Sequence, residues 1–430
     1  MQNYFTKLIL GFKDNNIQIN NYSMFDGLIT IKVSLKLAEQ TCPSCGNKTS
    51  NVHDYKTRKF KHGNSNGYHI LIYYNRRRYL CRSCNKRFPE PNTFIDRYAK
   101  ISNQLNHLII NNLKDKLTFK QIAKDNNVSS STVIRRFDKH FSINKLSLPE
   151  VISFDEFKKS NKNSKRGKYA LAIADPINKK IIDIIPNRRK YQFDNYLETI
   201  SFDEKKRVNT VIIDMWDPYR DLTYKHFPNA LLVIDRFHYI RNIIWWFNDI
   251  RIKTMNSFKT NTKGYKLLKR YNKLLTKNPN DINSIFSYDV YSKKLVSEQS
   301  IIDECLELSE ELKKAYLIYK YFQNETKIPH DSIEESVSFI NQFVQKLFES
   351  KLLGSVDLAK TFINWKKEIA NSLYLTYEND KGKTRYSNGF IEGVNNYIKT
   401  FRRMSYNFRD FNRFITRIIT TFNNDYMIKA

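Results

Sequence analysis

The chain has 430 residues, of which 73 are Lys or Arg and 43 are Asp or Glu, so its formal net charge at pH 7 is +30. A hydrophobic share of 41%, with 14% aromatic residues, excludes a disordered protein, and the length allows about two to four domains with cores of their own. The excess of basic residues favours a polyanionic partner, most simply nucleic acid. No apolar run approaches the roughly 20 residues of a membrane span, and no secretory signal is recognisable, so we expect a soluble, cytoplasmic protein.

Residues 1–95 contain four of the five cysteines, in two pairs with the same spacing. The pairs are Cys42 and Cys45 in CPSCG, and Cys81 and Cys84 in CRSCN. Two residues between ligands let both thiolates face one ion, as tetrahedral zinc sites require. The strand-like stretch YHILIYYNRRRYL between the pairs is typical of a ribbon. We therefore expect a zinc ribbon with a structural Zn²⁺ held by all four thiolates, and a packing role for Cys305.

Residues 96–147 carry a helix-turn-helix pattern in LTFKQIAKDNNVSSSTVIRRFDKHF. Asn126 and Asn127 tolerate a left-handed turn, and Ser129 or Ser130 is suited to cap the second helix. An ordinary helical hairpin is the alternative, but spacing and charge together favour DNA binding. The positions of the second helix expected in the major groove are Ser130, Ser131, Arg135 and Arg136. The ribbon residues expected to contact phosphates are Arg76, Arg77, Arg78, Arg82, Lys86 and Arg87.

Five short apolar runs follow Pro149: VISFDEF, YALAIAD, KIIDIIP, TVIIDMW and ALLVIDRF. They predict strands of one mixed sheet, with a helix around residues 191–200 between the third and the fourth. Asp155 and Asp214 each come directly after a run of buried residues. On neighbouring strand ends the two carboxylates would share divalent metal, for which Mg²⁺ prefers hard oxygen ligands. For either aspartate alone, a turn or helix cap explains the residue equally well.

Residues 241–380 read as an all-helical insertion with few Gly or Pro. Trp245 and Trp246, near its start, have two open interpretations: stacking on unpaired bases or packing in the core. Trp216, beside Asp214, is a candidate contact for the DNA end that is cut.

The final segment contains SNGFIEGVNNYIKT, in which Glu392 is a lone acid in a basic tail. On a helix that starts near Ser387 or Asn388, an apolar stripe would face the sheet; it consists of Ile391, Val394, Ile398 and Phe401. Beside Glu392, the residues expected to contact DNA are Asn395, Asn396, Lys399, Arg402 and Arg403. In this arrangement Glu392 would bind a metal ion, and the amide and cationic side chains beside it would bind phosphate. The alternative is an exposed glutamate that balances nearby lysines.

The order of these motifs resembles the ISL-three family of bacterial insertion-sequence transposases over nearly the whole chain. The motifs that carry the resemblance are the ribbon, the helix-turn-helix, SFDEF, IIDMWDPYRD, FPNALLVIDRFH and SNGFIEGVNNYIKTFRRMSYNFRDFNRF. The resemblance implies a multidomain α+β protein with an RNase H-like α/β catalytic core. That core would comprise residues 148–240 and 381–430, interrupted by the all-α insertion at 241–380 and preceded by the zinc ribbon and the helix-turn-helix.

The resemblance also implies a DDE transposase whose triad is Asp155, Asp214 and Glu392, with two Mg²⁺ or Mn²⁺ ions. Asp235 and His238 match a D-x-x-H signature whose role is open: binding DNA or holding the fold. The implied reaction is strand cleavage at terminal inverted repeats and strand transfer into target DNA. The implied partner is double-stranded DNA in the bacterial nucleoid, with a homodimer in the active complex.

Two other functions are alternatives to this one. A non-catalytic DNA-binding regulator derived from a transposase would have no reason to keep all three acids. An RNA-binding or ribosome-associated ribbon protein fits the charge and the zinc ligands, but not the helix-turn-helix or the triad.

Overall fold

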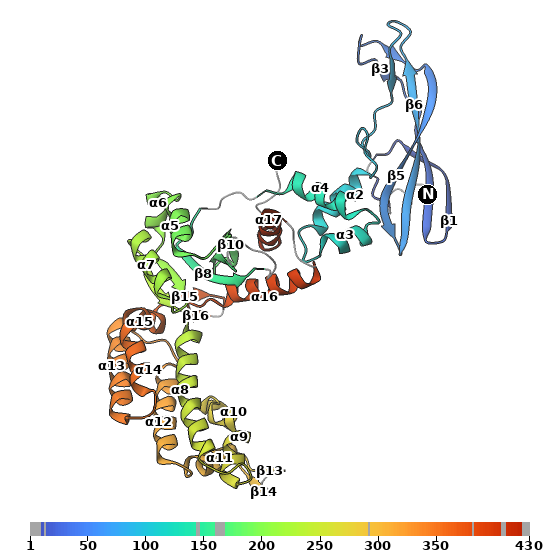
Figure 1. The fold of residues 1–430 in the computed structure, drawn as a ribbon. Coiled ribbons are helices and arrows are strands. Elements are labelled where there is room, and N and C mark those ends of the chain that lie inside the picture. Colours follow the sequence, from blue (N-terminus) through green and yellow to red (C-terminus); the bar gives the residue numbers. More distant parts are fainter. Residues whose placement is uncertain are drawn as a thin grey trace. The chain divides into compact units, whose positions relative to one another are not determined.

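The computed structural model describes residues 10–12, 14–142, 147–159, 168–290, 293–380, 382–405 and 410–423. They belong to two compact units (Figure 1). The first unit consists of Met1–Asn144 and Tyr397–Ala430, and the second of Lys145–Asn396. The expected C-terminal segment 381–430 is thus divided, because the chain from Tyr397 onward packs with the first unit. Helix α16 (Gly389–Met404) crosses this boundary in the sequence.

A twisted sheet forms the N-terminal part of the first unit. Its strands are β1 (Ile17–Phe25), β2 (Leu28–Leu35), β5 (Val52–Ser65), β6 (Tyr68–Leu80) and β7 (Arg87–Pro89). They lie in the order β1-β2-β6-β5, and β7 pairs with the end of β6. β2 and β6 run parallel, whereas β5 and β6 form a long antiparallel hairpin. Side chains of alternating positions, such as Ile31, Val33, Ile70 and Ile72, share one core because successive residues of a strand point to opposite faces.

The rest of the first unit is helical, with α2 (Asn103–Asn112), α3 (Phe119–Asp125), α4 (Ser130–His140) and α17 (Phe411–Phe422). The turn between α3 and α4 uses Asn127 at φ +48°, and Ser129 caps α4 by accepting the Thr132 amide at 3.2 Å. This confirms the predicted helix-turn-helix, with Ser129 as the cap. The C-terminal helix α17 packs on it: the fully buried Arg417 donates to the carbonyls of Asp115 and Leu117 at 2.6 and 2.8 Å.

The second unit begins with a five-stranded mixed sheet. Its strands are β8 (Val151–Lys158), β9 (Tyr169–Asp175), β10 (Lys180–Ile185), β11 (Thr210–Ile213) and β12 (Leu231–Ile234). Its order is β10-β9-β8-β11-β12, antiparallel from β10 to β8 and parallel from β8 to β12. The helices that connect these strands are α5 (Lys190–Glu198), α6 (Phe202–Arg207) and α7 (Asp217–His226). All five predicted strands and the helix predicted at 191–200 are confirmed.

After β12 the chain enters a set of helices that extends from the sheet of the same unit, and α8 (Arg236–Asn256) runs through it (Figure 1). The other elements are α9 (Lys263–Arg270), α10 (Asn272–Leu275), η1 (Pro279–Asp281), α11 (Glu298–Leu306), α12 (Glu310–Glu325), α13 (Ile333–Ser350), α14 (Ser355–Asn364) and α15 (Lys366–Tyr374). Sheet and helices share one continuous hydrophobic core.

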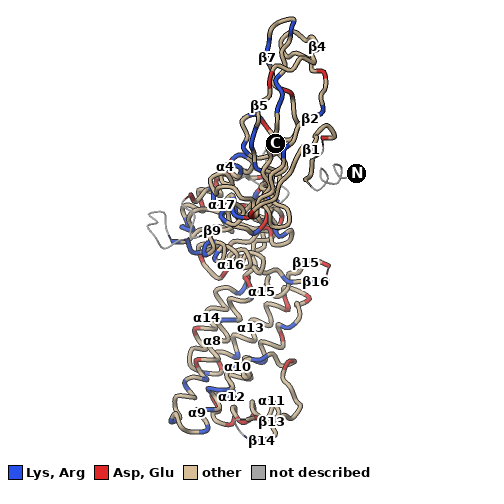
Figure 2. Tube along the Cα trace, turned by 90° about the vertical axis from the view of Figure 1, so that its right-hand side faces the viewer, with Lys and Arg blue, Asp and Glu red and all other residues tan. Residues whose placement is uncertain are grey.

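Two short hairpins add strands that were not predicted. The first lies inside the segment 241–380, which was expected to be all-helical, and the second begins there and ends in the segment 381–430. They are β13 (Ser287–Asp289) with β14 (Lys294–Val296), and β15 (Thr376–Asn379) with β16 (Gly382–Arg385). Both basic and acidic residues lie along the helices from α8 to α14 (Figure 2). Within the part of the chain that the structure describes, no helix combines the length and apolarity that crossing a membrane requires.

Candidate catalytic centre and DNA-binding elements

Asp155 and Asp214 lie level with each other on neighbouring parallel strands. The β8–β11 register pairs Ser153 with Ile212, and each aspartate lies two residues further along the chain. Because side chains alternate with a period of two, both carboxylates leave the same face. Asp214 follows the last residue of β11, whereas β8 continues past Asp155 because it still pairs with β9. Asp155 is therefore inside a strand rather than at its end, but it lies where the parallel pairing stops.

The two carboxylates influence each other electrostatically. Burial raises the pKa of Asp155, and the negative charge of Asp214 raises it further, to about 7. Opposing hydrogen bonds come from the Glu156 amide and from the side chain of Asn395. A buried carboxyl with a raised pKa beside a like charge is typical of functional sites, and it also marks a place where a cation would be stabilised.

Helix α16 holds both aspartates through two asparagines. Asn395 Nδ2 donates to Asp155 Oδ2 at 2.7 Å, and Asn388 Nδ2 donates to Asp214 Oδ1 at 3.1 Å. Both asparagines are at least 95% buried. Asn388 stands at the start of the helix, since its carbonyl accepts the Glu392 amide at 2.9 Å. Asn395 was expected to contact DNA, but its burial and its bond to Asp155 give it a positioning role instead.

Glu392 lies on the same side of α16 as these two asparagines. The spacing i, i+4, i+7 from Asn388 through Glu392 to Asn395 covers roughly 60° of the helix surface. Glu392 is exposed, whereas the predicted apolar stripe of Ile391, Val394, Ile398 and Phe401 is completely buried. The helix thus presents its lone acid between the two residues that hold Asp155 and Asp214. The spacing of seven residues between the two asparagines is the signal in the sequence for this arrangement, and Asn388 was not among the predicted site residues.

Asp235 and His238 connect the neighbouring strand end to the same centre. Asp235 caps α8 through the Phe237 amide at 2.8 Å, and its other oxygen accepts the backbone amide of Asn388. The His238 ring places Nε2 2.9 Å from Asp214 Oδ1. Burial lowers the pKa of His238, but the hydrogen bond to Asp214 and the charge of that carboxylate outweigh it, so the pKa is raised above 6.5. In this structure both residues hold the centre together.

The residues at this centre fit divalent metal. Carboxylates are the hard oxygen ligands that Mg²⁺ and Mn²⁺ prefer. The buried amide oxygens of Asn388 and Asn395 have no hydrogen-bond partner among the described residues, so both side chains keep an oxygen available next to the carboxylates. The three carboxylates are not among the described groups whose ligand atoms all lie within 4.8 Å of one another. A two-ion site does not require this, because ligands of different ions stand farther apart than ligands of one ion.

A second group of possible ligands, Asp194, Glu198 and His226, does meet that distance criterion. Its carboxylates already have partners in the protein, however, since the His226 ring also lies 2.5 Å from Asp194. Lys225 Nζ lies 2.7 Å from Asp194 and 3.2 Å from Glu198. We therefore interpret this group as an ion-pair network between α5 and α7.

Trp216 lies close to the centre but is not free. Its ring stands edge-on to Tyr219, with 4.4 Å between centroids, and the Arg188 guanidinium lies 5.3 Å from the Trp216 ring centroid. Arg188 also forms an ion pair with Glu156, the residue after Asp155. Trp216 is half-buried in this cluster, so its expected contact with the DNA end stays a prediction.

Removing the Asn395 amide tests how strongly the centre depends on positioning. We expect Asn395→Ala to lower the strand-cleavage rate about 10- to 100-fold, the usual effect of losing a group that orients a metal ligand. Cleavage rates should be measured across a Mn²⁺ titration, and added metal should recover part of the loss. Asn364→Ala, at an exposed asparagine on the last turn of α14, is the control and should change the rate less than twofold. Equal rates for the two variants would contradict the positioning role.

The four paired cysteines form one cluster. Their sulfur atoms all lie within 4.8 Å of one another, with Cys42–Cys84 and Cys45–Cys81 at 3.5 Å. Four ligands at the zinc–thiolate distance of about 2.3 Å would place neighbouring sulfurs about 3.8 Å apart, so the cluster fits a structural zinc ion. Hydrogen bonds of the type Gly46 N to Cys42 O (3.0 Å) and Asn85 N to Cys81 O (2.8 Å) shape both turns. Cys305 is buried in α11, apart from this cluster.

The basic residues of the ribbon fall into two groups. Arg77 is 7% exposed, pairs with Glu90 at 2.8 Å and donates to two carbonyls, so it cannot reach a phosphate in this structure. Arg76 donates to the Glu90 carbonyl, and Arg78 pairs with Asp54. Arg82, Lys86 and Arg87 are exposed. Basic segments along β5 and near β7 are visible in Figure 2.

Helix α4 exposes most of its predicted DNA-binding residues. Ser130, Ser131 and Arg135 are exposed, and Arg136 is half-buried. Arg135, Arg136 and Lys139 line a hollow of about 430 Å³, whose other wall includes Lys100 and Tyr98. On α16, Asn396, Lys399 and Arg403 are exposed and Arg402 is half-buried. Four cations around one hollow next to the second helix of a helix-turn-helix suit a DNA phosphate.

Together, the zinc-ligand cluster, the helix-turn-helix and the acid-bearing sheet define a multidomain α+β protein that binds DNA. Three family models match the chain in the same order. They are described as zinc-finger of transposase IS204/IS1001/IS1096/IS1165 (residues 38–84), helix-turn-helix domain of transposase family ISL3 (90–140) and transposase (152–418). The last match covers more than half of the chain. The protein therefore belongs to the ISL3 (ISL-three) family of transposases.

A curated relative supports the same family. The transposase for insertion sequence element IS1001 of Bordetella parapertussis is 21% identical over 405 residues. The match covers 91% of this chain and 92% of the relative. The similarity thus includes the ribbon, the helix-turn-helix and the acid-bearing domain.

Proposed function

We propose that the protein is a DDE transposase that cuts and joins DNA strands at the ends of an insertion sequence, with Asp155, Asp214 and Glu392 as its metal-binding triad. The observation that carries the proposal is the pair of asparagines on α16. They hold Asp155 and Asp214 on either side of the helix position that Glu392 occupies. The order of strands, with Asp155 on the central strand, suits an RNase H-like core interrupted by the helical segment after β12.

In this proposal the two reactions are in-line phosphoryl transfers. Water attacks a phosphate at the transposon end, the bond to the 3′ oxygen breaks, and the freed 3′-hydroxyl then attacks a phosphate of the target. Two Mg²⁺ or Mn²⁺ ions held by the three carboxylates would supply Lewis-acid stabilisation of the attacking and leaving oxygens. Asn388, Asn395 and His238 keep the aspartates oriented, so little reorganisation is needed when the DNA binds.

DNA recognition would use the first unit. Ser130, Ser131 and Arg135 would approach base edges, and the hollow beside α4 would take a backbone phosphate. Exposed ribbon residues would add phosphate contacts; these are Arg82, Lys86 and Arg87. The proposed substrate is the pair of terminal inverted repeats, and the active complex would contain two copies of the chain because two ends must be brought together. Such a complex would act on DNA in the bacterial cytoplasm.

A regulator that has lost catalysis is the competing function. It would need the ribbon and the helix-turn-helix, but it would gain nothing from two buried asparagines that orient a pair of aspartates. Burial, and then the charge of Asp214, raise the pKa of Asp155, and a bound cation would offset the cost of ionising this carboxyl.

Metal-dependent cleavage distinguishes the two functions. Purified protein, incubated with a plasmid that carries the complete element, should produce strand breaks at the element ends with Mg²⁺ or Mn²⁺ and none with EDTA. Ca²⁺ should support binding of the ends but little cleavage, because its larger and more flexible shell positions the reacting oxygens poorly. Specific binding of the ends without cleavage under any metal would favour the regulator.

A further inference from the structure

The outer face of α8 carries an exposed aromatic and cationic stripe that the proposed chemistry does not use. Phe237 and Trp245 are each 56% exposed, and Arg241 lies between them. The Arg241 guanidinium carbon stands 5.3 Å from the ring centroid of Phe237 and 4.7 Å from that of Trp245. We refer to Phe237, Arg241 and Trp245 as the α8 stripe. The spacing i, i+4, i+8 places all three on one side of the helix.

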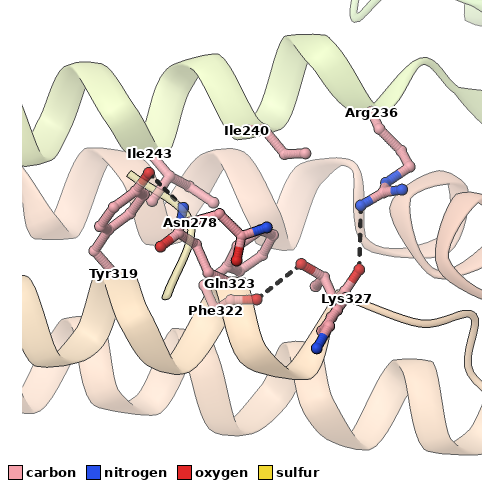
Figure 3. A pocket seen from close by; sticks show the side chains of 9 residues that line it. Arg236, Ile240, Ile243, Asn278, Tyr319, Phe322, Gln323 and Lys327 are labelled. Carbon is pink, nitrogen blue, oxygen red and sulfur yellow. Dashed lines mark hydrogen bonds between the residues drawn. The ribbon is translucent and has the colours of Figure 1, made fainter. Parts of the chain in front are cut away.

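The opposite side of α8 is buried in the protein interior. Tyr239, Ile243 and Phe247 are fully buried in the core that α8 shares with α12 and its neighbours. Arg236, Ile240 and Ile243 border a pocket of about 230 Å³ against α12 (Figure 3). At 100° per residue, the centre of this pocket-lining group is roughly 130° around the helix from the α8 stripe. Packing of the insertion therefore leaves the stripe uncovered by α12.

The two neighbouring tryptophans of α8 separate on these two sides. Trp246 is 5% exposed and donates its indole N–H to the Leu353 carbonyl at 3.0 Å, so it is a core residue. Trp245 is exposed, and the Arg241 guanidinium lies over its ring. The open choice between stacking and packing is thus resolved differently for each residue, and Trp245 alone is accessible to a ligand.

The α8 stripe begins at the candidate catalytic centre. Arg241 Nη2 lies 3.3 Å from His238 Nδ1, and His238 Nε2 lies 2.9 Å from Asp214 Oδ1. In this chain of contacts Arg241 donates to the ring, and the ring donates to the carboxylate. One hydrogen-bonded path therefore joins a proposed metal ligand to the middle of the stripe.

The chemistry of the stripe identifies its ligand. Arg241 forms no ion pair with a carboxylate among the described residues; it meets two ring faces and a histidine. Exposed aromatic rings beside a planar cation are the means by which proteins stack unpaired bases without reading their sequence. Eight residues of helix advance about 12 Å, which matches about three stacked nucleotides. The net charge of +30 suits the same ligand.

We propose that the α8 stripe binds unpaired nucleotides of the DNA strand that enters or leaves the centre at Asp214. The inference rests on the proposed strand-cleavage function, because such a reaction exposes unpaired bases beside the cut. Trp245 and Phe237 stack on bases, and Arg241 stacks between them while it neutralises a phosphate. The stripe thus acts as a holding site for a single strand, separate from the duplex-binding elements of the first unit.

The test compares single-stranded and duplex DNA on the full-length protein. The probes are a fluorescein-labelled oligothymidylate of 12 nucleotides and the duplex of the same length with its complement. We expect Trp245→Ala to weaken oligothymidylate binding about tenfold, the typical effect of losing one stacking contact, and to change duplex binding less than twofold. The slope of log affinity against log salt should stay unchanged, because no charge is lost. Arg241→Lys, which keeps the charge but loses the planar group, should lower the affinity for the single strand several-fold.

Phe202→Ala is the matched control, since Phe202 is a 64% exposed aromatic residue on α6. It should leave both affinities unchanged, and all three variants should melt within about 2 °C of the parent because they change exposed or half-exposed side chains. Equal losses for single strand and duplex, or no loss in Trp245→Ala, would overturn the stripe as a single-strand site, and a second protein or a second copy of the chain would then be its occupant. The proposed catalytic triad is tested by a different experiment. If cleavage survived substitution of the triad, the proposed function would fail, but the oligothymidylate result would still stand.

Discussion

Replacing any one of Asp155, Asp214 and Glu392 by its amide is expected to abolish strand cleavage while the element ends stay bound. The rate should fall on the order of a thousandfold or more, because residues that act as one catalytic unit cannot substitute for one another. An amide has nearly the same shape as the carboxylate but lacks the charge that holds a divalent cation. Cleavage should be followed on a labelled DNA end, with binding measured in parallel by gel shift.

Two further observations make this experiment decisive. Asp217→Asn is the control. Asp217 comes only three residues after Asp214, but its carboxylate is 61% exposed and pairs with Arg220. Its substitution should change the cleavage rate less than twofold. Asp155→Asn should also make the metal-free protein at least as stable as the parent at pH 8, because the Asp155 pKa of about 7 means that ionisation of this buried group opposes folding. Full cleavage by any triad variant would refute that residue's assignment.

The sign of this pH effect follows from the raised pKa. Well below pH 4 Asp155 is protonated in both the folded and the unfolded protein, so its ionisation contributes nothing to stability. As the pH rises toward 7, the unfolded chain loses the proton first, so the contribution of Asp155 to stability decreases. In the Asn variant this decrease is absent, and thermal unfolding of parent and variant from pH 5 to pH 8 measures the difference.

Loss of one zinc ligand is expected to unfold the tip of the ribbon. Only a small core lies at this end, consisting of Tyr79 and Phe88 with two of the cysteines themselves. Structural zinc contributes about 10–16 kcal/mol in isolated fingers, far more than so few apolar side chains can supply. Cys42→Ser should therefore reduce bound zinc from one ion per chain to none, and DNA affinity should fall about tenfold or more as the ribbon loses its shape.

Cys305→Ala supplies the control for this prediction. It removes a buried thiol in α11, outside the cluster, and should leave one zinc per chain and unchanged DNA affinity at a modest loss of stability. Zinc content by mass spectrometry and protease cutting within residues 38–90 report on the ribbon directly. A Cys42→Ser protein with full zinc and an intact ribbon would show that the four thiolates are not the ligand set.

Local signals in the sequence identified the elements of the fold. Five apolar runs predicted five strands, paired asparagines predicted the turn between α3 and α4, and the cysteine spacing predicted the zinc-ligand cluster. Each of these signals lies within a few residues, where backbone preference, hydrophobic period or ligand geometry acts directly. The acids were also recognisable, since Asp214 directly follows its buried strand.

The partners of those acids were decided by the tertiary structure. Asn395 reads as one of several polar residues on a basic helix, and only the packing of α16 brings it to Asp155, 240 residues earlier. Arg77 stands in a run of three arginines, yet burial beside Glu90 removes it from the surface. Trp245 and Trp246 are adjacent and identical in type, and the direction in which α8 packs makes one accessible and the other a core residue. Composition and spacing specify which groups a chain has, whereas burial and long-range contact decide which of them can act.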